Sequence, residues 1–173
     1  LTDIVSITRN PRNQGYIEYV GHDTYINWRK ETESAGDFAI SIGSTTIDHI
    51  NYLADPYGEQ IEFLTYYYYE PRSRQNVNFN YKYEQHNVSV NMTRMGHMNI
   101  YGTAGGGTKS DPHIMTNVSY SYDWSPDIDT YVSIRNIDDV MPQKDTGYSY
   151  PFFNEGYYSA FGRYLTAGIT YRF

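Results

Sequence analysis

The stretch that comes closest to a catalytic motif in this sequence is the glycine-rich segment Gly102–Ser110. Gly102 and Gly107 have the separation found in phosphate-binding loops, but Thr108 stands where such a loop has lysine, and Lys109 follows one position late. A phosphate loop also needs a helix directly after it, because the amide groups of the helix amino terminus hold the anion. No helical pattern follows Ser110, so we interpret the segment as a flexible connection.

Metal and acid–base chemistry find little support in the residue spacing. The histidines stand at positions 22, 49, 86, 97 and 113, without the i, i+4 spacing of a metal site. His97 and His113 could approach each other across the loop that they bracket, but scattered surface histidines are the favoured interpretation. The aspartate pairs at 127/129 and 138/139 fall in a predicted turn and loop, and no nucleophile elbow is present. The sequence predicts no enzyme, no cofactor and no metal.

Aromatic residues crowd the long connections and are the best candidates for ligand contact. These candidates are Tyr66, Tyr67, Tyr68, Tyr69, Phe152, Phe153, Tyr157 and Tyr158. Their rings could stack on a sugar, a catechol-type chelate or another planar small molecule. The alternative is that they pack within the loops or form a girdle at a membrane interface. Both interpretations stay open at this point.

Composition narrows the class of protein. The chain has 173 residues, with 20 acidic and 13 basic side chains and no basic stripe, so nucleic acid is not an expected partner. No apolar run reaches the roughly 20 residues of a membrane helix. A high content of tyrosine together with polar Asn, Ser and Thr is nevertheless typical of transmembrane barrels, whose apolar residues alternate with polar ones. The absence of cysteine excludes disulfides and thiol chemistry.

The end of the chain, Phe161–Phe173, shows this alternation most clearly. Every second residue from position 165 is apolar: Leu165, Ala167, Ile169, Tyr171 and Phe173. The interleaved residues are small or polar, which indicates a two-faced strand. A soluble sheet would rarely expose such a strand, because its edge invites aggregation. A strand between lipid and a polar lumen has this pattern.

The same period of two predicts about eight strands. The runs are 1–9, 16–30, 37–50, 76–83, 87–93, 114–122, 128–137 and 161–173. Connections near 31–36, 84–86 and 124–127 are short, whereas those near 50–73, 98–112 and 138–160 are long. Short turns at one rim and long loops at the other are typical of outer-membrane barrels. The prediction is all-β: a transmembrane antiparallel β-barrel in the bacterial outer membrane, its carboxyl terminus at the periplasmic rim, with membrane lipid and the barrel-assembly machinery as partners.

Four short motifs sharpen this class. Asn136-Ile-Asp-Asp139 resembles an Asn-Leu-Phe-Asp signature, with Ile137-Asp138 in place of the usual Leu-Phe, and Gly162-Arg163 precedes a terminal aromatic strand. Upstream, 21–28 resembles a Gly-x-Glu-x-x-x-x-Tyr strand, and Glu70-Pro71 leads into the strand at 74–79. In this order and spacing, the motifs resemble the carboxyl-terminal part of TonB-dependent outer-membrane receptors. The positions matching the family's motifs are Asn136, Asp139, Gly162 and Arg163.

The resemblance implies a single-domain segment, residues 1–173, of a barrel of about 22 strands. The plug, the earlier strands and the contact with TonB would lie outside these residues. The intact receptor would import a scarce small-molecule nutrient, most commonly a ferric siderophore or similar metal chelate. The resemblance also implies an assembly signal in the last strand, at Leu165, Ile169, Tyr171 and Phe173.

Two alternatives concern the extent of the barrel. The chain opens on a strand-like run, so we expect either a removed leader or a start within a larger protein. A self-contained eight-stranded barrel, acting as a structural anchor or passive pore, is the competing prediction. Such a narrow barrel fills its bore with side chains, and Ala39, Ser41 and Gly43 on the predicted inner face are too small for that. The large barrel is therefore favoured.

Overall fold

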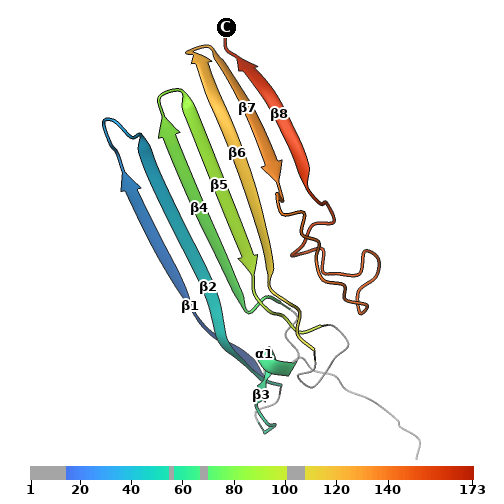
Figure 1. Ribbon diagram of the computed structural model, residues 1–173. Helices are drawn as coiled ribbons and strands as arrows, with labels where there is room; N and C mark the ends of the chain where they lie inside the picture. Colours follow the sequence, from blue (N-terminus) through green and yellow to red (C-terminus); the bar gives the residue numbers. More distant parts are fainter. Residues whose placement is uncertain (1–14, 55–56, 67–69, 101–107) are drawn as a thin grey trace, which may run out of the picture.

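The computed structural model describes residues 15–54, 57–66, 70–100 and 108–173 (Figure 1). It contains one antiparallel sheet in the order β1-β2-β4-β5-β6-β7-β8, with β3 paired to the end of β2. The strands are β1 Tyr16–Lys30, β2 Asp37–Leu53, β3 Ile61–Glu62, β4 Ser73–Tyr83, β5 His86–Met95, β6 His113–Ser125, β7 Ile128–Arg135 and β8 Tyr164–Tyr171. A single turn of helix, α1, covers Phe63–Tyr66. The predicted all-β antiparallel sheet is confirmed.

The strand bounds differ from the prediction mainly where strands meet long loops. β2 continues three residues further, because Leu53 pairs with Tyr16 of β1. β7 ends two residues earlier, because Asn136 adopts a φ of 52° and leaves the extended conformation. β8 is shorter than predicted at both ends. The predicted strand over 1–9 lies outside the described residues.

One face of the sheet is apolar from edge to edge. Residues opposite each other in antiparallel strands project to the same face, so the ladder itself shows which side chains share it. One row crosses all seven long strands and is entirely apolar: Trp28, Ile40, Phe79, Val90, Val118, Ile134 and Leu165. Several of its members and neighbours are open to the surroundings, with Leu165 65% and Ile169 72% exposed. We call this surface the apolar face.

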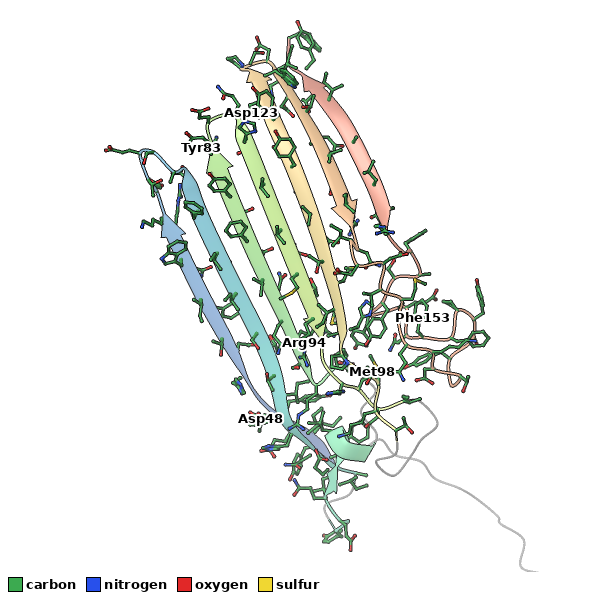
Figure 2. The ribbon with its side chains drawn as sticks, in the orientation of Figure 1. Asp48, Tyr83, Arg94, Met98, Asp123 and Phe153 are labelled. Atoms are coloured by element: carbon green, nitrogen blue, oxygen red, sulfur yellow. The ribbon has the colours of Figure 1, made fainter. Side chains whose placement is uncertain are left out.

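The apolar face changes character along the strands. At the short-turn end it carries aromatic side chains in contact, with ring centroids 4.8 Å apart for Phe38 and Tyr81 and 4.7 Å apart for Tyr122 and Trp124. At the long-loop end the apolar residues give way to Arg94, whose guanidinium donates to Gln75 Oε1 at 2.8 Å. Tyr83 and Arg94, labelled in Figure 2, lie toward these two ends. The apolar zone between the aromatic and polar ends runs along β5 from His86, the partner of Tyr83, to Arg94, which is eight residues or about 26 Å.

The opposite, polar face carries a hydrogen-bonded group of asparagines. The Asn91 amide donates to Asn76 Oδ1 at 2.7 Å and to Asn78 Oδ1 at 2.8 Å. Asn117 donates in turn to Asn91 Oδ1 at 3.2 Å. The row beside them is also small or polar across the inner strands: Ala39, Asn80, Ser89, Ser119 and Ser133. This face is suited to contact with water.

The connections alternate in length as predicted. Short turns join β1 to β2, β4 to β5 and β6 to β7 at one end of the sheet, and the long connections all lie at the other end (Figure 1). The buried hydrophobic residues lie at the long-loop end, where Ile50 packs with Leu64 of α1. β1 and β8 form the two edges, and within the described residues the sheet does not close into a barrel. No helix in the described part of the chain is long and apolar enough to cross a membrane.

Two glycines, one in β2 and one in the turn before it, differ in how closely neighbouring atoms approach them. Gly36 has a φ of +83°, and a Cβ there would collide with the backbone carbonyl of Lys82. We expect Gly36→Ala to lower the free energy of unfolding by roughly 1–3 kcal/mol, because a left-handed backbone and a steric clash act together. Gly43→Ala is the matched control, since its Cβ would only touch the Tyr25 ring at 3.4 Å. Urea unfolding measures both variants, and equal losses of stability would contradict the close contact found at Gly36.

Candidate functional site

The loop over 138–160 folds back across the polar face. The Arg74 guanidinium at the start of β4 lies 4.8 Å from the centre of the Tyr157 ring. The Tyr158 ring meets His113, the first residue of β6, edge to face at 5.1 Å and 74°. Arg74 and His113 both pair with Met95 of β5, so they share the polar face. The loop therefore covers the long-loop end of three neighbouring strands on this side of the sheet.

A cavity of about 220 Å³ lies between this loop and the two segments 98–100 and 110–113. Its apolar lining includes Met98, Met141, Phe153 and Tyr158. Met98 and Phe153 are buried and both lie at the long-loop end (Figure 2). The ring of Phe153 is nearly perpendicular to that of Tyr158, at 82° and 6.5 Å. We call this the outer cavity.

A second cavity, of about 250 Å³, lies between the loop and the polar face itself. Met95, Met115, Tyr157 and Phe161 are among its lining residues. His113, Val140 and Tyr158 line both cavities. The edge-to-face ring pair of His113 and Tyr158 therefore stands between the outer cavity and the space over the polar face.

Both loop tyrosines keep their phenol protons more strongly than a free tyrosine. Burial raises the pKa of Tyr158, and the nearby charge of Arg74 opposes the shift. Burial also raises the pKa of Tyr157, and its hydrogen bond and charge interaction with Glu70 add to the effect. At neutral pH both phenols are neutral hydrogen-bond donors.

The structure brings together some of the predicted ligand-contact residues and separates others. Phe153 and Tyr158 line the outer cavity, and Tyr157 lines the second one. Phe152 lines neither described cavity: its ring lies 5.1 Å from the Lys144 ammonium and 6.0 Å from the Tyr150 ring. Tyr66 belongs to α1, and the predicted contacts Tyr67, Tyr68 and Tyr69 lie outside the described residues.

Other lining residues were missed by the sequence analysis. Met98, Met141 and Asn154 carry no periodic signal and fit no known motif, so only the folded loop brings them together. The suggested approach of His97 to His113 takes another form, because His97 Nδ1 lies 2.7 Å from the Ser110 carbonyl oxygen and His113 contacts Tyr158. Among the described residues, no group of three His, Asp or Glu could hold a metal ion.

The four family-motif positions meet at the base of the same loop. Asn136, with a positive φ, donates to the Val140 carbonyl at 2.9 Å and accepts from the Val140 amide at 3.0 Å. Asp139 Oδ1 accepts from the Arg163 amide at 2.7 Å. A Cβ on Gly162 would lie 2.7 Å from that same oxygen, so glycine lets the chains approach. These bonds tie the end of β7 to the start of β8.

The residues predicted as an assembly signal lie on the last strand or just beyond it. Leu165, Ile169 and Tyr171 pair with Ile134, Thr130 and Ile128 of β7 and stand on the apolar face. The ring of Phe173 lies 6.4 Å from that of Tyr171, and all four predicted residues are exposed. Their recognition by an assembly machinery stays a prediction.

Asn136 is the residue through which this base is best tested. Its side chain is buried and makes two hydrogen bonds to Val140. Asn136→Gly keeps the left-handed backbone but leaves those backbone groups unpaired, at an expected cost of roughly 1–3 kcal/mol in the free energy of unfolding. Asn136→Ala should cost about 1 kcal/mol more, because alanine disfavours a positive φ. Urea unfolding measures both, with the exposed neighbour Asp138→Ala as a control expected to change little. An Asn136→Ala variant with an unchanged free energy of unfolding would contradict this role.

The comparisons with known proteins complete the description of the site. No family model, no curated protein and no solved structure matches this chain. The resemblance to TonB-dependent receptors therefore rests on the four short motifs, two of which meet at the base of the 138–160 loop.

Proposed function

We propose that this chain forms part of the wall of an outer-membrane receptor of the TonB-dependent type, in a Gram-negative bacterium. The observation that carries the proposal is the exposed apolar face, which runs unbroken across seven strands. The surface is about 29 Å wide at the spacing of β-strands and about 26 Å long, or about 750 Å². Apolar patches on soluble monomers rarely exceed roughly 300–600 Å².

Lipid is the occupant that this face fits best. The length of the apolar face along the strands is comparable to the roughly 25 Å height of an outer-membrane apolar band. Strands in such barrels are tilted, so the height of this face along the membrane normal is about a quarter less than its length. Aromatic side chains at one end, including Tyr122 and Trp124, match the girdle at a membrane interface. Arg94 at the other end reaches beyond the apolar zone, as long basic side chains do at a lipid boundary.

A large barrel fits the polar face better than a small one. Side chains fill the bore of an eight-stranded barrel, whereas the polar face here includes Ala39, Ser41 and Gly43. β1 and β8 are both open edges in the described sheet, and backbone groups in lipid must be paired. In the proposed receptor, the closed barrel has about 22 strands in all, including those described here. The barrel-assembly machinery inserts this barrel into the outer membrane.

The long loops face outward in this proposal, and the carboxyl terminus lies at the periplasmic rim. The outer cavity then contacts the ligand before it enters the lumen. A plug and TonB, contributed outside these residues, supply the energy for import. The ligand is a scarce nutrient, with ferric siderophores and similar metal chelates as the leading class from the family resemblance. The chain itself supplies no catalysis.

A pair of neighbouring substitutions tests the assignment of the two faces. Val118 stands on the apolar face and Ser119 on the polar face of β6. Val118→Arg should destabilise the membrane-inserted protein by about 2–4 kcal/mol, since it places a charge near the middle of the lipid. Ser119→Arg should cost much less, because its side chain faces water. The folded fraction after insertion into vesicles is the measurement, and equal losses would contradict the proposed membrane orientation.

Uptake by cells tests the function itself. Cells that carry the intact gene should import a labelled ferric chelate faster than a deletion strain, and uncoupling the proton gradient should abolish the difference. The protein should also fractionate with the outer membrane. Uptake independent of both the gene and the energy source, across a panel of chelates, corrinoids, peptides and oligosaccharides, would refute the import proposal. Uptake that needs the gene but not the proton gradient would indicate a passive pore.

A further inference from the structure

We propose that the outer cavity binds a compact, uncharged aromatic or heteroaromatic ring. The inference rests on the proposed function for its biological meaning, because it names the chemical group by which the receptor would recognise its ligand. The physical argument depends only on the cavity, which residues 98–100, 110–113 and the loop over 138–160 build together.

The size of the cavity selects a single ring. Its volume of about 220 Å³ is smaller than the roughly 300–1,000 Å³ of pockets for drug-sized ligands. One six-membered or fused ring with small substituents fits this space. A larger ligand would place one such ring here and leave its remainder outside.

The walls favour a flat π-system. Phe153 and Tyr158 meet nearly perpendicular to each other, and His113 meets Tyr158 in the same way, so the cavity presents both faces and edges of rings. Met98 and Met141 add two thioether groups. Sulfur and ring edges both make favourable contacts with aromatic rings. A purely aliphatic group would fill the volume without using these contacts.

Several polar groups of the wall already have partners, and the wall carries more negative than positive charge, which disfavours sugars and anions. Asp145 is buried and its Oδ1 accepts from the Gly147 amide at 2.9 Å, while the Lys144 ammonium lies against the Phe152 ring. Gln143 Oε1 accepts from the Asp111 amide at 2.7 Å. An anionic group would meet two carboxylates, Asp111 and Asp145, against one ammonium, Lys144, so it would lose its water without a net gain of opposite charge, and such burial is costly. A sugar, with a hydroxyl on most ring carbons, would meet too few unpaired partners.

Met141 lies at the opening of the outer cavity and is the best position for a substitution that blocks it. It is 54% exposed, whereas Met98 and Phe153 are buried, so Met141 lies at the rim. A tryptophan in its place can occupy the cavity without removing a buried side chain. Tyr150 offers a matched control in the same loop, because it is 85% exposed and does not line the cavity.

The experiment uses the full-length protein in detergent micelles and three water-soluble probes: nicotinamide as an uncharged ring, benzoate as a charged ring and glucose as a sugar. The five methionines of residues 1–173, labelled at their methyl groups, report binding by NMR. Nicotinamide should shift the signals of Met98 and Met141 and leave that of Met92 on the apolar face unchanged. Benzoate and glucose should shift none. Met141→Trp should weaken nicotinamide binding at least about tenfold, and Tyr150→Trp should not.

Each result decides the inference. Shifts at Met98 and Met141 with nicotinamide alone support it, even where the Met141→Trp variant fails to assemble. It is overturned by no shift at these residues, by equal binding of benzoate or glucose, or by undiminished affinity in an assembled Met141→Trp protein. Gel migration before and after heating checks assembly. Import and outer-membrane fractionation are measured in cells without these probes, so failure of the ring site is distinguishable from failure of the receptor proposal.

Discussion

The register of the antiparallel ladder is the constraint on which the whole structure depends. A slip of one residue would exchange the two faces of a strand, placing asparagines beside valines on both sides of the sheet. The pairing of Phe79 with Val90 and of Val90 with Val118 keeps apolar residues on one surface through the middle of the sheet. The same pairing brings Asn78, Asn91 and Asn117 together on the other surface. Hydrogen bonds along the backbone thus divide the molecule into an apolar and a polar side.

The alternation of apolar and polar residues with a period of two made most of this sheet predictable from the sequence. The first described strand was predicted with the bounds that the structure has, and every long connection falls at the expected end of the sheet. Strand ends were less predictable, because they depend on particular residues rather than on a repeating pattern. Asn136 ends β7 through its backbone conformation, and Leu53 prolongs β2 through its partner in β1. Closure into a barrel and its location in the membrane stay predictions.

The region proposed to contact a ligand was predictable only in outline. Aromatic density pointed to the 138–160 loop, but the fold of that loop depends on contacts between residues far apart in the chain, such as Arg74 with Tyr157 and His113 with Tyr158. No local pattern encodes these pairs. Asn136 and Asp139, at the base of the loop, were found through the family resemblance. The structure shows that the side chains of both residues make hydrogen bonds that hold this base together. Asn136 bridges the turn through its side-chain bond to Val140, and its backbone amide donates to Asn117 Oδ1 of the asparagine group.

The bond between Asp139 and Arg163 joins residues 24 positions apart and closes the loop at its base. The entropy of closing a loop grows slowly with length, by about 0.6 kcal/mol for each doubling. Insertions or exchanges between these two residues therefore need not disturb the pairing of β7 with β8. Such a loop can change in sequence and length while the sheet stays constant, so the loop and the scaffold can evolve separately. It is also a natural place to insert a foreign segment without disturbing the sheet.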